Sequence, residues 1–134
     1  MKDLIWDKSL SVQVDEIDDD HQKLINLFNL INHAMEDGES PEYIEALVEE
    51  LISCTAWHFR HEERLMVKYS YKGLEEHRAE HNELIQSAVE LKKTLSSNES
   101  FSLTSENIDF LERWLTGHIL GPDMDLGAFL GETM

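Results

Sequence analysis

The sequence is poor in several residue types that mark secreted, membrane and nucleic-acid-binding proteins. It has one cysteine, Cys54, so no disulfide can form within the chain, and this favours a reducing compartment. Basic residues number 11 against 28 acidic ones, which gives a formal net charge of −17. A chain this acidic repels phosphate groups, so we expect neither nucleic acid nor an anionic membrane surface as a partner.

Long hydrophobic runs are also missing. No apolar stretch approaches the roughly 20 residues that a membrane-spanning helix needs, and the first ten residues mix apolar with charged side chains. We therefore expect no signal peptide, no membrane insertion and a cytoplasmic location. Hydrophobic residues still make up 41% of the chain, which argues against disorder. The length of 134 residues predicts a single domain over residues 1–134.

Apolar residues recur at helical spacing in four segments. The first is predicted to start near Asp19, which has the capping-box spacing to Gln22, and to close at Asp37-Gly38. The second opens at Ser40-Pro41, where a capping residue precedes a proline at the first helical position. It ends before the short break Tyr71-Lys72-Gly73.

The third segment runs from about Leu74 to Leu95 and is followed by the polar loop Ser96-Ser97-Asn98. The fourth starts near Thr104 or Ser105 and is interrupted at Gly121-Pro122, because proline cannot continue a helix without losing a backbone hydrogen bond. Short loops between four helices favour antiparallel neighbours.

The predicted fold class is therefore all-α, an antiparallel up-down-up-down four-helix bundle. The first sixteen residues show no helical period, and we expect them to form an N-terminal arm packed on the bundle. A short C-terminal segment, ending near Phe129-Leu130, is expected after the fourth helix.

Five histidines and two carboxylates fall at informative positions in these segments. His58 and Glu62 are four residues apart, as are His77 and His81, so each pair projects from one face of its helix. A carboxylate in an apolar stripe, such as Glu62, is costly unless it is paired or bound to a metal. The predicted topology brings the starts of the first and third helices and the ends of the second and fourth to one end of the bundle. It therefore predicts that the histidines and Glu62 converge there: His21, His58, Glu62, His77, His81 and His118.

Asp123 needs a separate argument, because five residues on a regular helix turn it about 140° away from His118. Pro122 removes a backbone donor, and its ring clashes with the carbonyl of His118. Local unwinding at this point, or a wider helical turn, would bring Asp123 towards the other six residues. A regular helix through residues 118–123, with Asp123 in solvent, would contradict this hypothesis.

Histidine and carboxylate ligands suit divalent iron, manganese or zinc. Two octahedral ions have twelve coordination positions, of which five histidines fill five. Two bridging carboxylates fill four, and one bridging hydroxide or oxide fills two. One position is left open, whereas a purely structural site is expected to close completely. The set therefore predicts a two-metal site that binds one small molecule.

At this point the residues resemble the hemerythrins, in particular the single-domain bacterial form. The resemblance covers nearly the whole chain, and all seven ligand positions agree with the family pattern in residue type and spacing. Its motifs here are Trp6, Asp18-Asp-Asp-His21-Gln-Lys-Leu24, His58-Phe-Arg-His-Glu62-Glu63, His77-Arg-Ala-Glu-His81 and Trp114-Leu-Thr-Gly-His118-Ile-Leu-Gly-Pro-Asp123.

The resemblance implies a non-haem di-iron centre, two iron ions joined by a bridging hydroxide or oxide, that binds dioxygen reversibly. It implies that Glu62 and Asp123 bridge the irons. One iron is then held by His77, His81 and His118, and the other, which carries the open position, by His21 and His58. The family's apolar dioxygen pocket corresponds to Leu24, Phe59, Trp114, Leu115 and Ile119. Each of these five would be apolar in any bundle, so their pocket role rests on the resemblance alone.

Several further residues are given structural interpretations. His33 lies away from the apolar stripe of the first helix and is expected to be exposed. His61 lies at the edge of its stripe, a position from which a neighbouring helix is within reach, and it is not expected to bind metal. Glu63 is assigned to the surface or to support of a ligand, Cys54 to packing, and Trp57 to an exposed edge or a self-association surface.

The leading functional hypothesis is a dioxygen-binding protein for carriage, storage or delivery, not an enzyme, with an unidentified protein client that accepts oxygen. The alternative is a di-iron oxidase or peroxidase. Such sites in four-helix bundles use more carboxylate, whereas histidine here outnumbers it five to two. An oxygen sensor would have to act through a separate partner, because no signalling module is visible in the sequence. Zinc binding or metal storage is a third interpretation, but zinc prefers four-coordinate sites.

Overall fold

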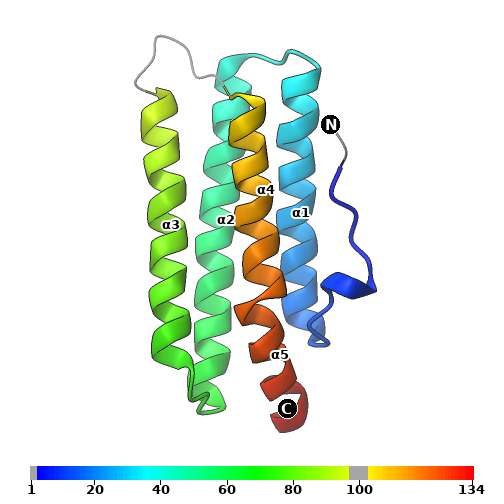
Figure 1. The fold of residues 1–134 in the computed structure, drawn as a ribbon, viewed down its shortest axis with the longest axis vertical. Coiled ribbons are helices and arrows are strands. Elements are labelled where there is room, and N and C mark those ends of the chain that lie inside the picture. The colour runs from blue at the N-terminus through cyan, green and yellow to red at the C-terminus, as the bar shows by residue number, and fades with distance from the viewer. Residues whose placement is uncertain (1–2, 97–102) are drawn as a thin grey trace.

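Four long helices form a bundle in the computed structural model, which describes residues 3–96 and 103–134, and each runs antiparallel to the next one in the chain (Figure 1). They are α1 (Asp15–Glu36), α2 (Pro41–Lys68), α3 (Leu74–Ser96) and α4 (Ser105–Leu120). A shorter helix, α5 (Pro122–Thr133), follows α4, and a 3₁₀ helix, η1 (Lys8–Leu10), lies in the N-terminal arm. All regular structure in these two ranges is helical, which confirms the predicted all-α bundle.

Most predicted helix boundaries are confirmed by the capping interactions. The Ser40 side chain accepts a hydrogen bond from the backbone N–H of Tyr43 at the start of α2, with proline next in the chain. Thr104 and Asn107 form a reciprocal capping box at the start of α4. After α1, Gly38 has a φ of 68°, the left-handed conformation in which glycine has no steric penalty. Of the predicted loop after α3, Ser96 is helical, and Ser97 and Asn98 lie outside the described residues.

The start of α1 was predicted wrongly. The helix begins at Asp15 rather than near Asp19, and Val14 is its N-cap residue without a side-chain capping bond. Asp18 accepts hydrogen bonds from the Ser11 hydroxyl at 2.6 Å and from the Val12 N–H at 2.9 Å, so it holds the arm against the first turn. Acidic residues in that turn also interact favourably with the helix dipole. The extra turn is therefore stabilised by contacts with the arm, which a local capping pattern does not contain.

The N-terminal arm packs along α1, as the sequence predicted (Figure 1). The Leu4 N–H donates to the Asn29 side-chain oxygen at 2.9 Å, and the Asn29 amide donates to the Leu4 carbonyl at 2.8 Å. The arm is not wholly irregular, because it contains η1, whose first turn is capped by the Asp7 carboxylate. These bonds fix the arm beside the helix that carries His21.

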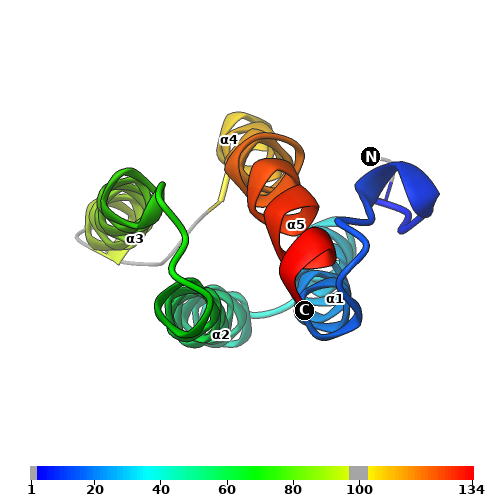
Figure 2. The ribbon, with the colours of Figure 1, turned by 90° about the horizontal axis from the view of Figure 1, so that it is seen from below.

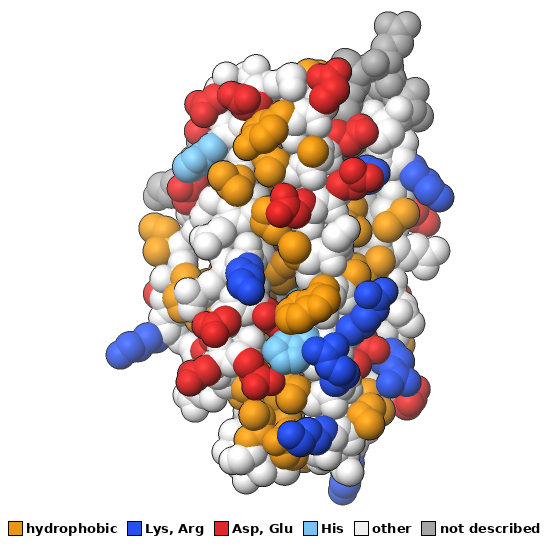
Figure 3. Space-filling view, turned by 180° about the vertical axis from the view of Figure 1, so that it is seen from behind, with side chains coloured by type: hydrophobic (Ala, Val, Ile, Leu, Met, Phe, Trp, Pro, Cys, Tyr) orange, Lys and Arg blue, Asp and Glu red, His pale blue; other side chains and the backbone are white. Residues whose placement is uncertain are grey.

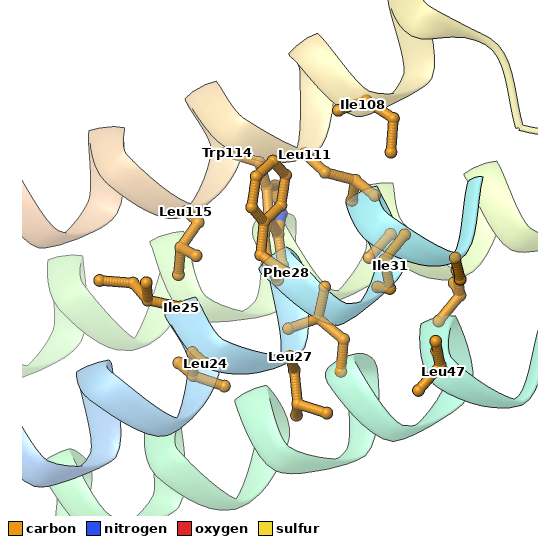
Figure 4. Packing of buried hydrophobic residues seen from close by; sticks show 14 of the residues in the cluster. Leu24, Ile25, Leu27, Phe28, Ile31, Leu47, Ile108, Leu111, Trp114 and Leu115 are labelled. Carbon is orange, nitrogen blue, oxygen red and sulfur yellow. The ribbon is translucent and has the colours of Figure 1, made fainter. Parts of the chain in front are cut away.

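The bundle has two separate hydrophobic clusters, one towards each end. The larger cluster lies nearer the α1–α2 loop, where Ile25 and Phe28 of α1 point towards Leu111, Trp114 and Leu115 of α4 (Figure 4). The smaller cluster lies at the opposite end and joins the arm, α1, α2 and α5 through Val12, Val14, Ile17, Leu65, Met66, Leu126 and Leu130. Along α1, α2 and α3, the predicted metal ligands fall between residues of the two clusters, and Asp123 falls between Ile119 of the larger cluster and Leu126 of the smaller one.

The C-terminal segment is a helix, α5, that extends past the predicted end at Phe129-Leu130 to Thr133. Seen from below, it leads from the end of α4 towards α1 (Figure 2). Leu126 and Leu130 are 0% exposed in the smaller cluster, so α5 closes this end of the bundle. Among the described residues, no helix is both long enough and apolar enough to span a bilayer.

Gly127 marks the closest approach of α5 to the arm. A Cβ atom at this position would lie 2.3 Å from the Val12 carbonyl oxygen, whereas a Cβ at Gly131 would have nothing within 4 Å. We predict that Gly127→Ala lowers the free energy of unfolding by about 1–3 kcal/mol, the usual cost of overpacking. Gly131→Ala on the same helix is the control, and it should be neutral or stabilising by up to about 1 kcal/mol. Urea unfolding of the two variants measures both effects, and equal stability would contradict the close packing of α5 on the arm.

Candidate metal centre

All seven predicted ligands meet in one buried layer of the bundle. The antiparallel arrangement places the first part of α1, the last part of α2, the first part of α3 and the end of α4 at the same end (Figure 1). None of the seven is more than 6% exposed, and Glu62, Asp123 and His21 are 0% exposed. The structure therefore brings together every residue that the sequence selected: His21, His58, Glu62, His77, His81, His118 and Asp123.

Three histidines surround one pair of carboxylate oxygens. Glu62 Oε1 lies 3.0 Å from His81 Nε2, 3.5 Å from His118 Nε2 and 3.6 Å from His77 Nε2. Asp123 Oδ1 lies 2.9 Å from His118 Nε2 and 3.1 Å from His77 Nε2. All three rings thus direct the same nitrogen, Nε2, towards the two carboxylates.

Two histidines face the other pair of carboxylate oxygens. His21 Nε2 lies 2.7 Å from Asp123 Oδ2. His58 Nε2 lies 3.3 Å from Glu62 Oε2 and 3.7 Å from Asp123 Oδ2. Each carboxylate therefore presents one oxygen to the three-histidine group and the other oxygen to the two-histidine group, which is the arrangement of a bridging ligand.

The separations suit two metal ions with mixed nitrogen and oxygen ligands. Two ligand atoms at right angles about an ion, each about 2.1 Å from it, lie about 3.0 Å apart. In the three-histidine group, the ligand atoms of the histidines and both carboxylates all lie within 4.8 Å of one another. The same holds for the two-histidine group with the same carboxylates. Glu62 and Asp123 belong to both groups.

Several buried polar atoms in this layer make no hydrogen bond. They include Nε2 of His58, Nε2 of His81 and Oε2 of Glu62, all of which face the centre of the cluster. Each lies at ion-pair distance from another ligand atom of the cluster but outside hydrogen-bond geometry. A metal ion would provide the missing interaction for each of them, so the unpaired atoms fit the di-iron site that the sequence predicted.

The carboxylates strongly perturb the pKa values of the histidines in the metal-free protein. Burial lowers the pKa of His58, but the charge of Glu62 and hydrogen bonds that the ring donates to carboxylates outweigh it, and the pKa lies well above its usual value. For His77, burial is likewise outweighed by Asp123 and Glu62, which raise the pKa to about 9. Burial raises the pKa of Glu62, but His58 and His118 hold it well below its usual range. Metal ions must displace these protons, so metal binding strengthens as pH rises.

The backbone breaks where Pro122 predicted it. Gly121 has φ −101° and ψ −103°, outside the helical region, and separates α4 from α5. The break confirms local unwinding between His118 and Asp123, and it turns the Asp123 side chain into the cluster, where it is 0% exposed. The Met124 N–H bonds to the Gly121 carbonyl, so the chain becomes helical again directly after the break.

Carboxylates behind the cluster hold the histidine rings in place. Asp20 Oδ2 accepts from His58 Nδ1 at 2.9 Å, and Glu63 Oε2 accepts from His81 Nδ1 at 2.9 Å. Each bond assigns the proton of a neutral ring to Nδ1, which leaves Nε2 free to bind a metal. The support role expected as one option for Glu63 is thus observed.

Sequence reasoning did not identify Asp20. The signal was its spacing: Asp20 lies three residues after Ile17 and four before Leu24, both of which are buried, so it belongs to the inward face of α1. Asp20 also accepts a hydrogen bond from His61 Nδ1 at 2.6 Å, and His61 Nε2 lies 2.9 Å from Glu16 Oε1. His61 therefore contacts α1, which its position at the edge of the stripe allowed, and it lies outside the seven-residue cluster.

The five predicted dioxygen-pocket residues are all buried around this layer. The Phe59 ring stacks on the His81 ring with centroids 3.8 Å apart, and it meets the His118 ring edge-on at 4.9 Å. The Trp114 indole N–H donates to the Leu84 carbonyl at 2.9 Å, which ties α4 to α3. Leu24 and Phe59 line two different surface hollows, one beside His58 and one beside His81.

Comparison with known proteins assigns the chain to a family. A family model described as the hemerythrin HHE cation-binding domain matches residues 12–130. The chain belongs to the hemerythrin family, which confirms the resemblance seen in its motifs.

Individual relatives agree with this assignment. The chain is 33% identical to a myohemerythrin of Riftia pachyptila over 119 residues, which cover 89% of this chain and 87% of that protein. It is 29% identical to a bacteriohemerythrin of Pseudomonas paraeruginosa over 123 residues, 92% of this chain and 78% of that protein. The crystal structure of a wild-type hemerythrin superposes with a TM-score of 0.84 at 25% identity, covering 93% of this chain and 95% of that one.

The supporting carboxylates generate a prediction about metal affinity. Asp20→Ala and Glu63→Ala should each weaken metal binding by about 10–100-fold, because His58 or His81 loses the partner that fixes its ring. Glu83→Ala, on the exposed surface of α3, is the control and should leave affinity unchanged. Competition with a chelator of known affinity measures the effect. Native affinity in both test variants would show that these carboxylates do not orient the ligands.

Proposed function

We propose that the protein binds dioxygen reversibly at a di-iron centre and serves in oxygen carriage, storage or delivery. The observation that carries the proposal is the unequal division of the histidines about the two carboxylates. Three histidines face Oε1 of Glu62 and Oδ1 of Asp123, whereas two face the other oxygens. With both carboxylates bridging, the two-histidine side has one protein ligand fewer, so an open position for a small molecule falls there.

Each group of residues would have a distinct role at the centre. Glu62 and Asp123 would bridge the two irons and neutralise part of their charge, and the histidines would complete the two sides: His77, His81 and His118 on one, His21 and His58 on the other. Iron would supply the electrons that dioxygen needs in order to bind. Asp20 and Glu63 would keep the His58 and His81 rings in the orientation that binding requires.

Apolar side chains around the layer favour reversible binding over reaction. Leu115 and Ile119 are 3% and 0% exposed, and Phe59 covers the His81 ring. A dry surrounding keeps out water and anions that would compete for the open position and leave the irons oxidised. Delivery of the oxygen would require a protein client that accepts it. An oxidase, a peroxidase or a sensor would differ from a carrier in the fate of the bound dioxygen, so the same experiment separates these functions.

A visible absorption spectrum tests the proposal directly. The protein is loaded with ferrous iron under argon, exposed to air and returned to argon. We expect two irons per chain, and an absorption band that appears in air and fades under argon over repeated cycles. A one-way change to a stable oxidised spectrum would overturn reversible carriage and favour the enzyme or sensor alternative. Failure to bind iron would overturn the di-iron centre itself.

The apolar surroundings give a second prediction. Leu115→Ala should keep both irons but shorten the lifetime of the oxygenated form several-fold, because water gains access to the layer. Leu111→Ala is a matched control, one helical turn further from the ligands and equally buried. Each variant should lose about 2–5 kcal/mol of stability through the cavity that it leaves. Absorbance decay in air measures the lifetime, and equal decay in both variants would place the pocket elsewhere.

A further inference from the structure

A hollow between α1 and α2 opens on the protein surface directly over the two-histidine side of the centre. It has a volume of about 240 Å³ and is lined by Asp20, Lys23, Leu24, Cys54, Trp57 and His58. Trp57 is 51% exposed, whereas Leu24 and His58 are only 3% and 1% exposed and form the innermost lining. Figure 3 shows the face of the molecule formed by α1 and α2, where hydrophobic side chains gather between charged ones. We call this cavity the α1–α2 hollow.

The lining of the α1–α2 hollow is mainly apolar. Two of its residues are charged: Lys23 is exposed to solvent, and Asp20 is already engaged by hydrogen bonds from His58 and His61. Burial and the nearby Glu50 raise the pKa of the Cys54 thiol, so this side chain is uncharged at neutral pH. Leu24, Cys54 and Trp57 therefore form a wall that suits a small uncharged molecule better than an ion.

Only the imidazole ring of His58 separates the α1–α2 hollow from the candidate metal centre. His58 lines the hollow, its Nδ1 bonds to Asp20, and its Nε2 lies 3.3 Å from Glu62 Oε2. Leu24, the other innermost residue, lies one helical turn after His21. The hollow is several times larger than the roughly 30 Å³ that one water molecule occupies in the liquid, so a diatomic molecule fits in it readily.

We propose that the α1–α2 hollow is the route by which dioxygen, or another small uncharged ligand, enters and leaves the two-histidine side of the metal centre. The inference rests on the proposed function for the identity of the ligand. A small shift of the buried Leu24 side chain would complete the passage beside the His58 ring, and the half-exposed Trp57 side chain at the surface moves fast enough not to limit entry.

A second hollow, between α2 and α3, is the competing route. It has a volume of about 500 Å³ and reaches His81 and Phe59. Four charged residues line it, including Arg60, Glu90 and Lys93, against two in the α1–α2 hollow, and these groups favour water over a gas molecule. Inside, the Phe59 ring lies flat on the His81 ring, and His81 belongs to the three-histidine group, where protein ligands are more numerous. The larger hollow therefore leads to the side of the centre that is less open.

Two substitutions on α2 distinguish the routes. Cys54 lines the α1–α2 hollow and Ala56 lines the other, and both are half-buried. We expect Cys54→Trp to slow dioxygen association and dissociation by the same factor, about tenfold or more, which corresponds to an added barrier of ~1.4 kcal/mol. The dissociation constant should not change, because an obstruction acts in both directions. Ala56→Trp should leave both rate constants unchanged. Stopped-flow mixing of each iron-loaded variant with dioxygen measures its association and dissociation rate constants, which are compared with those of the unmodified protein.

Chemical modification of Cys54 gives the same test, and it adds the bulky group only after the protein has folded. Because Cys54 is the only cysteine, thiol reagents of increasing size fill the α1–α2 hollow selectively in the folded protein. The rate constants should fall with reagent size, and Cys54→Ser treated in parallel should not respond. As a readout independent of iron, xenon added to the zinc-loaded protein should shift the NMR signals of Leu24 and Trp57, and modification of Cys54 should abolish that shift.

The outcomes separate this inference from the proposed function. Reversible dioxygen binding with rate constants that are insensitive to Cys54 modification would overturn the route and leave the function intact. Slowing by Ala56→Trp instead would assign the route to the α2–α3 hollow. A change in the dissociation constant through the dissociation rate alone would mean that Cys54 acts on the bound ligand rather than on its passage. An absence of reversible binding in the unmodified protein would overturn the function, while the xenon shift would still test the hollow.

Discussion

The structure depends on the interaction between two carboxylates without solvent exposure and the five histidines around them. Burial of Glu62 and Asp123 would be prohibitive if each stood alone, since an isolated charge loses its hydration without compensation. In the metal-free protein, protonated histidines compensate that charge, and their pKa values are raised accordingly. Two metal ions would replace those protons. The same seven side chains thus suit both states, and the bundle need not be rebuilt when metal enters.

This polar layer divides the hydrophobic core into two. Leu24 and Ile119 belong to the larger cluster, and Ile17 and Leu126 belong to the smaller one on the other side of the layer. The larger cluster joins α1, α2, α3 and α4, and the smaller one joins the arm, α1, α2 and α5, so the ligands are positioned from both directions. The break at Gly121 serves both the polar layer and the smaller cluster. It turns Asp123 inwards, and α5 then continues far enough for Leu126 and Leu130 to close the smaller cluster.

The parts of this arrangement that obey local rules could be predicted from the sequence. The periodicity of apolar residues indicated the four long helices, and their short connections indicated the antiparallel topology that brings the ligands together. Pro122 indicated the break before Asp123. The start of α1 and the position of Asp20 were not predicted, because both depend on partners beyond the local pattern. Ser11 and Val12 fix the first turn through Asp18, and His58 and His61 bind Asp20 across the α1–α2 interface. Spacing on one helix shows which face a residue occupies, but not which atom on the next helix it meets.

Asp20 connects the orientation of a ligand with the character of the α1–α2 hollow. Its Oδ2 accepts hydrogen bonds from both His58 and His61, and these bonds fix the His58 ring with Nε2 towards Glu62. The same bonds satisfy the one carboxylate in the lining of the hollow, so its charge is not left to attract water there. An apolar residue at this position would leave His58 free to rotate, and an unpaired carboxylate would make the hollow wet. A carboxylate held by two histidines avoids both effects, and this explains why a charged side chain is compatible with an apolar passage beside the metal centre.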